Sequence, residues 1–296
     1  MKIATGKYTG NGTSQSIATL GVVPDMAIVK GASVRTAYMR LDVHPGANSM
    51  ILGAVGGFST TAITALTATG FDIGDDADVN TNGETFYWVA FEAESGDMKT
   101  GTYTGDGIHP QSVTGIGFTP DVAFVHSANE EVHWRTSDVV GVSSMRVRVP
   151  GFSGGHIEAL NADGFDAGNS FNSNGVLYYF VCFKNVVGKS KTIKYAGDGL
   201  DNRSITGFGM RPGFVFLSCI ANTGGIDSCL KFTHQQGDIS FDTDEAETAD
   251  RIQAFEADGF QVGTDDRVNK GAGTPDVYSW AVDVRRQRQG AVMIIG

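Results

Sequence analysis

The sequence is poor in the residues that mark several common classes of protein. It has three cysteines, Cys182, Cys219 and Cys229, an odd number without a CxxC spacing, which predicts neither a disulfide framework nor a zinc site. Lysine and arginine number 22 against 33 acidic residues, giving a formal net charge of -11. Because nucleic-acid affinity depends on cations that neutralise phosphates, we expect no nucleic-acid partner. We expect the thiols to be free and mostly buried.

Long hydrophobic runs are also missing. No stretch approaches the roughly 20 apolar residues of a membrane span, and the first residues lack the apolar core of a secretory signal. We therefore expect a soluble protein without a membrane partner, made and kept in the cytoplasm of the producing cell. Forty glycines and 41% hydrophobic residues, with only 19% charged, indicate a folded chain that is rich in turns.

The main feature of the sequence is a unit that occurs three times. It begins with a tyrosine and an Asn-Gly or Asp-Gly turn, at 8–12, 103–107 and 195–199. A proline before an apolar run follows, at 24–29, 120–125 and 212–217. An Ile-x-Ala-(Leu or Phe)-x-x-x-Gly-Phe-x-x-Gly block comes next, at 63–74, 157–168 and 252–263, and an asparagine (Asn80, Asn172, Asn269) precedes a final aromatic strand. Four ordered blocks in three copies predict three homologous domains, 1–97, 98–190 and 191–296.

Each copy has the pattern of an all-β domain. Short runs rich in Val, Ile, Phe, Tyr and Thr are separated by Gly-containing turns at the spacing typical of a sandwich or barrel. We predict three tandem homologous β-sandwich domains, jelly-roll-like, in a pseudo-threefold arrangement that mimics a trimer. A helix over 245–257 is a competing interpretation, because Ile252 and Phe255 lie three residues apart among helix formers.

We expect the recurring residues to have structural roles, because a catalytic group is rarely needed three times in one chain. Function is expected where the copies differ, near 31–59, 127–156 and 219–249. We expect variable loops there, which carry Tyr38, Arg40, Trp134 and Arg135. Aromatic residues beside arginine could bind a sugar or anchor a protein interface. A solvated loop with one partly buried aromatic remains the alternative. His126 replaces Lys30 and Ser218 at an equivalent strand end, which indicates an exposed position.

Apparent catalytic and metal motifs lack their context. Ser153 lies in a G-x-S-x-G sequence, but a nucleophile elbow needs a strand-turn-helix setting and a partner histidine. The acidic stretches 75–80 and 242–245 could offer oxygens to Ca²⁺, yet neither matches an EF-hand loop, and the six histidines show no ligand spacing. We predict no catalytic residues, no metal site and no cofactor; acidic turn tips remain the default, with calcium as an open alternative.

The C-terminal segment departs from the repeat. Arg285, Arg286 and Arg288 form a basic patch, and five apolar residues follow at 291–295. The segment is predicted to dock on an acidic partner or to add a strand to a neighbouring subunit. A strand packed on its own third domain is the alternative.

The Gly-x-Tyr-Thr-Gly-Asn-Gly segment (6–12), the Pro-Asp pair before an apolar strand (24–30) and the Gly-Phe-x-x-Gly block with Tyr-Trp-Val-Ala-Phe (70–91) together resemble a repeat of tailed-bacteriophage virion proteins. The third copy departs from it at Ala196, Gly213 and Ser279. The resemblance implies a β-sandwich building block on the outside of a phage particle, in capsid decoration, tail or fibre, and it carries no catalytic residues.

We therefore expect a non-enzymatic virion structural protein, assembled in the host bacterial cytoplasm, that decorates or stabilises the capsid or forms part of the tail exterior. Its expected partners are other virion proteins, in an oligomer or multi-copy assembly. The alternative is a carbohydrate-binding module of a tail fibre that contacts host glycans. A hydrolase is least favoured, because no acid-base pair or triad can be assembled from the sequence.

Overall fold

The computed structural model describes residues 1–52, 57–148, 151–220, 228–234, 239–240, 246–247, 250–271 and 276–284. The first third contains β1 (Lys2–Thr9), β2 (Gln15–Ile17), β3 (Met26–Gly31), β4 (Tyr38–Leu41), β5 (Ser49–Ile51), β6 (Phe58–Ser59), β7 (Ile63–Thr67), β8 (Gly70–Ile73), α1 (Ala77–Asn80) and β9 (Thr85–Glu92). The second contains β10 (Met98–Thr104), β11 (Gln111–Val113), β12 (Val122–Ser127), β13 (His133–Thr136), β14 (Ser143–Arg146), β15 (Phe152–Gly154), β16 (Ile157–Asn161), β17 (Gly164–Ala167), the 3-10 turn η1 (Asn169–Phe171) and β18 (Leu177–Phe183). The last contains β19 (Ser190–Ala196), β20 (Arg203–Thr206), β21 (Phe214–Cys219), β22 (Cys229–Phe232), β23 (Ile239–Ser240), β24 (Ile252–Glu256), β25 (Gly259–Val262), α2 (Asp266–Asn269) and β26 (Asp276–Val282).

The chain is all-β, which confirms the predicted class. Each third builds one large and one small antiparallel sheet from its own strands, in the same order each time. The large sheets run β1-β9-β3-β4-β5-β6, β10-β18-β12-β13-β14-β15 and β19-β26-β21-β22-β23, and the small ones run β2-β8-β7, β11-β17-β16 and β20-β25-β24. Residues 252–256 form strand β24, so the helical alternative is wrong there. Among the described residues, no helix has the length and apolar character needed to cross a membrane.

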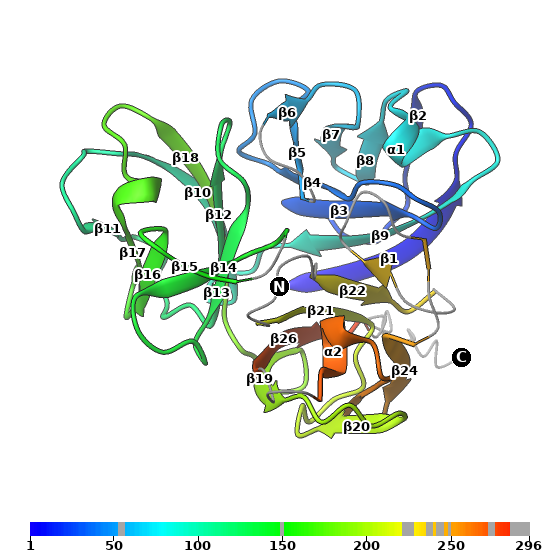
Figure 1. Cartoon of the computed structure of the whole chain (residues 1–296). Helices are drawn as coiled ribbons and strands as arrows, with labels where there is room; N and C mark the ends of the chain where they lie inside the picture. Colours follow the sequence, from blue (N-terminus) through cyan, green and yellow to red (C-terminus); the bar gives the residue numbers. More distant parts are fainter. Residues whose placement is uncertain are drawn as a thin grey trace, which may run out of the picture.

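The three thirds occupy three parts of the molecule (Figure 1). The two sheets of each third share a hydrophobic core. In the first third, Phe71 of the small sheet packs edge-on against Trp88 of the large sheet, with ring centroids 5.7 Å apart. Phe165 and Phe180 make the same contact in the second third, at 5.5 Å. These pairs come from the Gly-Phe block and the aromatic strand, so two of the repeated sequence blocks meet face to face in the core.

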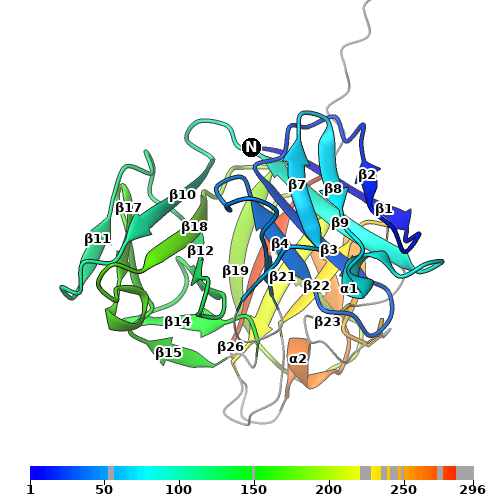
Figure 2. The ribbon, with the colours of Figure 1, turned by 90° about the horizontal axis from the view of Figure 1, so that it is seen from above.

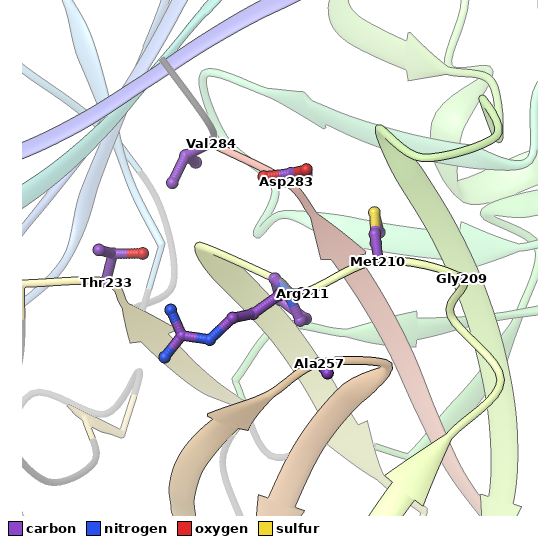
Figure 3. Close-up of a pocket in the computed structure, with 8 residues that line it drawn as sticks. Gly209, Met210, Arg211, Thr233, Ala257, Asp283 and Val284 are labelled. Carbon is purple, nitrogen blue, oxygen red and sulfur yellow. The ribbon is translucent and has the colours of Figure 1, made fainter.

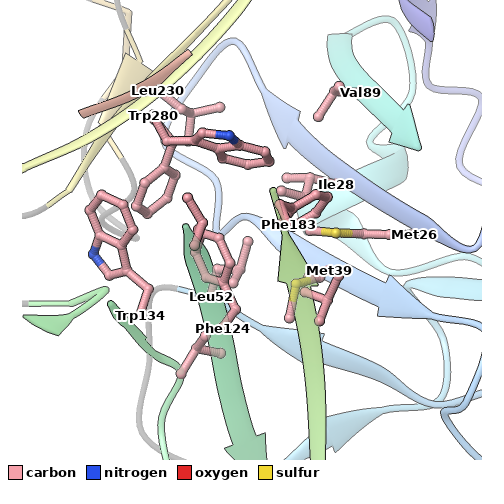
Figure 4. Close-up of a cluster of buried hydrophobic side chains, with 14 of the residues drawn as sticks. Met26, Ile28, Met39, Leu52, Val89, Phe124, Trp134, Phe183, Leu230 and Trp280 are labelled. Carbon is pink, nitrogen blue, oxygen red and sulfur yellow. The ribbon is translucent and has the colours of Figure 1, made fainter. Parts of the chain in front are cut away.

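The opposite faces of the three large sheets meet in a second, central core (Figure 4). Side chains alternate along a strand, so Trp88 and Ala90 belong to the first third's own core while Val89 and Phe91 reach the central one. Burial on both faces explains why β9, β18 and β26 are nearly continuous apolar runs. Phe91, Phe183 and Trp280, one from each third, pack with centroids 4.4 to 5.6 Å apart.

In the view from above, β19 and β26 of the last third appear between the second third, in green, and the first third, in blue (Figure 2). Contacts between the thirds recur in cyclic order, as expected of a pseudo-threefold arrangement. Phe58 of the first third packs on Tyr179 of the second, and Phe152 of the second packs on Tyr278 of the third. The backbone N–H of Gly57 donates to the Ala128 carbonyl, and that of Glu247 donates to the Ala32 carbonyl, which returns the third copy to the first. We call these contacts the first–second, second–third and third–first seams. They close the three copies into a ring.

The repeated polar residues hold each unit together. The tyrosine hydroxyl donates to a carbonyl next to the short helical turn: Tyr8 to Val79 at 2.5 Å, Tyr103 to Phe171 at 2.8 Å and Tyr195 to Val268 at 2.8 Å. The asparagine side chain accepts from the backbone of the Asn-Gly or Asp-Gly turn: Asn80 from Asn11, Asn172 from Asp106 and Asn269 from Asp198, at 2.8 to 2.9 Å. Because these asparagines are buried, their hydrogen bonds satisfy groups that would otherwise destabilise the fold.

Candidate functional site

The four predicted binding residues that the structure describes are buried. Tyr38 and Arg40 lie on β4, and Trp134 and Arg135 on β13; their exposed fractions are 5%, 6%, 0% and 6%. The expectation that they lie in variable loops is wrong, because β4 and β13 are interior strands of the large sheets. These strands differ in sequence between copies while each faces a different part of the central core.

Arg40 and Arg135 each donate hydrogen bonds to the loop that follows their strand. Arg135 donates from its guanidinium to the carbonyls of Val139 and Gly141, at 2.9 and 2.7 Å, and to that of Ser143. Arg40 donates in the same way to carbonyls of residues 46 and 48. Burial lowers the pKa of both arginines from its ordinary value. Their side chains are therefore occupied by the chain's own carbonyls.

Trp134 anchors an interface between thirds of the same chain. Its ring stacks on Phe124 and meets Phe216 of the last third edge-on, with centroids 4.7 Å apart. Its indole N–H donates to the Ser218 hydroxyl at 3.0 Å. An aromatic anchor was predicted here for a sugar or a second protein; the structure places it against another copy of the repeat.

No tryptophan or tyrosine of the chain is exposed. All three tryptophans and all eight tyrosines lie in the described part, and each is buried or half-buried. A glycan site that relies on stacking needs an accessible aromatic face. Phe152, at 45%, is the one exposed phenylalanine among the described residues, and it already contacts Tyr278.

Arg285, Arg286 and Arg288 lie outside the described residues, which end at Val284. A pocket of about 640 Å³ lies beside Val284 and is lined also by Arg211, Thr233 and Asp283 (Figure 3). The second third has a pocket of about 450 Å³ at the same place in its fold, beside Pro120 and lined by Arg135 and Glu158. Both pockets are open hollows next to the proline that lies two residues before a large-sheet strand.

Ser153 has a histidine neighbour, but the geometry does not make that ring a base. The Ser153 Oγ lies 3.2 Å from Nδ1 of His156. The same Nδ1 lies 2.9 Å from the Gly154 carbonyl oxygen, which can only accept, so Nδ1 carries the ring proton. A protonated nitrogen cannot take the hydroxyl proton of Ser153. The serine also lies on the short strand β15, away from any strand-turn-helix elbow.

The acidic turn at 75–80 is used by the fold. The Asp76 side chain caps α1 by accepting from the Asp78 backbone N–H at 3.0 Å, and it accepts also from the hydroxyls of Ser59 and Thr61. Among the described residues, no group of three or more His, Cys, Asp or Glu side chains could hold a metal ion. The second acidic stretch, 242–245, lies outside them.

The three cysteines are free and buried, as predicted. Burial raises the pKa of the Cys219 thiol to about 11 and raises that of Cys182 further. Since the thiolate is the reactive form, these thiols are poor nucleophiles.

The position shared by Lys30, His126 and Ser218 was predicted to be exposed, and this is wrong. All three residues have no exposed surface, and each pairs across its sheet with a tyrosine at a seam: Tyr87, Tyr179 and Tyr278. This position holds three different residue types because its surroundings differ in the three copies, and not because it is exposed to solvent. This equivalent position is the candidate functional site, because it places a different polar group at each seam.

The three polar groups make different contacts. Lys30 donates from Nζ to the carbonyls of Gly31 and Ser33, at 3.0 and 3.2 Å, and burial lowers its pKa to about 8. Ser218 accepts from Trp134 and shares a 2.6 Å hydrogen bond with the Ser228 hydroxyl. His126 lies with its Nε2 3.1 Å from Nε2 of His44 in the first third. His126 and Ser218 therefore make hydrogen bonds across a seam, whereas Lys30 donates to carbonyls of its own third.

The sequence signal for this site was present but ambiguous. His126, Lys30 and Ser218 are all polar residues near the ends of apolar strands, where turns and buried contacts have the same composition. Burial of these residues can be recognised only when a neighbouring copy is placed over the outer face of the sheet.

Comparisons with protein-family models, with curated proteins and with solved structures found no match to this chain.

Proposed function

We propose that the chain is a non-enzymatic structural protein of a bacteriophage virion, which decorates or stabilises the capsid or forms part of the tail exterior. We propose also that its thirds, 1–97, 98–190 and 191–296, are tandem β-sandwich domains of jelly-roll-like type. The observation that carries the proposal is the ring itself. Recurring residues such as Tyr8, Asn80 and Phe91 are engaged in hydrogen bonds and packing, and the three copies close on a shared core.

The ring supports a role in an assembly. A closed ring of three similar units presents three similar outer surfaces, so one chain has the symmetry of a trimer without needing three chains. Such a unit suits a threefold or quasi-threefold position on a shell. Its partners are then other virion proteins, in many copies per particle, and assembly takes place in the bacterial cytoplasm, where free cysteines such as Cys182 remain reduced.

The basic patch of Arg285, Arg286 and Arg288 is the proposed attachment segment. It is the most cationic stretch of a chain with a net charge of -11, and an acidic surface on a neighbouring virion protein would complement it. The apolar residues at 291–295 could then add a strand to that neighbour.

The proposal predicts that the protein co-purifies with intact particles. Phage carrying the full-length gene, or a gene truncated after Val284, would be purified by density gradient, and the copies per particle counted by quantitative mass spectrometry. We expect a fixed number of copies from the full-length gene and at least a tenfold loss from the truncated one. A matched variant with Lys2 and Lys7 changed to glutamine removes two cations elsewhere and is expected to stay bound.

Two outcomes would contradict different parts of the proposal. Absence of the full-length protein from particles would remove the virion role. Retention of the truncated chain at the full copy number would leave the virion role in place and remove the attachment segment.

A further inference from the structure

The first–second seam contains a buried histidine pair that the other two seams lack. Lys30 and Ser218 occupy the place of His126 in the other copies, so the fold does not require histidine there. We propose that the His44–His126 pair makes the first–second seam sensitive to acid. The contacts across this seam are stable while both rings are neutral and are lost when either ring takes up a proton.

The neighbours of the two rings allow one arrangement of ring protons. The Leu41 backbone N–H donates to Nδ1 of His44 at 3.3 Å, so the proton of that ring lies on Nε2. Nδ1 of His126 lies 3.4 Å from the Ser127 carbonyl oxygen, which can only accept, so the proton of His126 lies on Nδ1. The Nε2–H of His44 therefore donates to the bare Nε2 of His126 at 3.1 Å. All four ring nitrogens are satisfied when both rings are neutral.

A second proton on either ring breaks this arrangement. On His126 it would place two N–H groups against each other at 3.1 Å, and on His44 it would turn Nδ1 into a donor facing the Leu41 N–H. The new charge would be buried between the rings of Phe58 and Tyr179. Uncompensated buried charge is costly, so the closed seam is destabilised.

Among the described residues, no carboxylate acts on the pKa of either ring, and a backbone group of Asn48 is the one neighbour that favours the protonated form of His44. Arg40 on β4 is the charged group that acts on His44, and it repels a proton. Tyr179 on β18 is the titratable neighbour of both rings, and burial raises its pKa, so it stays neutral at acidic pH. Phe58 on β6 and the Ser127 carbonyl on β12 also contact the rings and carry no charge.

The pH range follows from the direction of the pKa shifts. Burial lowers the pKa of His126 from 6.5 to about 4, and that of His44 well below its ordinary value. Between pH 6.5 and about 4 the opened seam therefore binds more protons than the closed seam. Opening is favoured by about tenfold for each histidine and each pH unit of acidification in this range, and pH has no effect above it.

Backbone hydrogen exchange of the full chain tests the proposal, because each seam has its own reporter amide. The hydrogen bond from the Gly57 N–H crosses the first–second seam. The bond from the Ser228 N–H crosses the second–third seam, and the bond from the Glu247 N–H crosses the third–first seam. After correction for intrinsic exchange, we expect the protection of Gly57 to fall by at least tenfold from pH 6.5 to 5, while Ser228 and Glu247 change by less than twofold. An equal loss of protection at all three amides, or no loss of protection at Gly57, would contradict the proposal.

A variant separates the histidine pair from general acid effects. The H44Q/H126Q variant keeps hydrogen-bonding groups at the seam, but glutamine does not take up a proton in this pH range. The protection of the Gly57 amide should therefore no longer depend on pH. His109 is exposed and pairs with Glu158, so H109Q is the matched control and should keep the wild-type response. If the double variant does not fold, ring ¹⁵N spectra of the wild type decide: Nε2–H on His44 and Nδ1–H on His126 at pH 7 support the proposal, and any other tautomer pair refutes it.

Discussion

At the scale of single residues, the recurring positions serve close contact and hydrogen bonding inside the fold. The tyrosine that opens each copy joins the large sheet to the short helical turn through one hydroxyl, as Tyr103 does with the Phe171 carbonyl. The sequence predicts a structural role for this residue because it occurs three times. The partner carbonyl, on the residue before the repeated asparagine, could not be predicted, because the sequence does not show where a backbone carbonyl points.

We expect Y103F to destabilise the chain by about 1 to 2 kcal/mol, because the Phe171 carbonyl loses its donor at 2.8 Å while the ring stays in place. Urea denaturation at neutral pH gives the change in the free energy of unfolding. Y179F is a matched control, since Tyr179 contacts the seam through its ring. Equal stability of Y103F and Y179F would show that the repeated hydroxyl contributes nothing.

At the scale of elements, the repeated Gly-Phe block makes a tight pair of strands in each small sheet. A Cβ on Gly164 would lie 1.9 Å from the Val113 carbonyl oxygen on the neighbouring strand, and the same clash occurs at Gly70 and Gly259. The glycine is therefore required for strand pairing as well as for the turn. The sequence predicts these strands correctly, because the turn and the apolar pattern are local.

We expect G164A to destabilise the chain by about 3 kcal/mol, since the backbone of β11 or β17 must shift to admit a methyl group. G154A on β15 is the matched control, because its nearest contact would be 3.9 Å away at the Val142 carbonyl. Thermal melts followed by circular dichroism give the two shifts. A melting temperature for G164A as high as that for G154A would contradict the close approach.

The sequence is less informative about the strands that carried the predicted binding residues. Tyr38 and Trp134 were assigned to variable loops because the copies differ there, and His126 was assigned to an exposed site for the same reason. Trp134 and His126 are buried because another third of the chain covers a second face of their sheet, whereas Tyr38 is buried in the first third's own core. Contacts between distant segments leave no local periodic signal, so the central core and the seam chemistry depend on coordinates.

At the scale of the whole molecule, the central core couples the three copies. Phe91, Phe183 and Trp280 come from different thirds and share one cluster, so no third can lose its packing without exposing the others. Each copy also has its own core, where Phe71 packs on Trp88. The balance between these cores decides whether the chain unfolds as three units or as one.

The shared core predicts a single cooperative unfolding transition for the three thirds. In scanning calorimetry the calorimetric and van't Hoff enthalpies should agree, although the chain contains three copies of one unit. W280A should lower the free energy of unfolding by about 3 to 5 kcal/mol and keep one transition, since Trp280 contacts Phe91 and Phe183 across two boundaries. F71A, which removes a ring from the first third's own core, is the matched control: it should cost a similar free energy and also keep one transition. A calorimetric enthalpy about three times the van't Hoff value would mean that the thirds unfold independently, and the ring would then be an arrangement of separate domains rather than a cooperative unit.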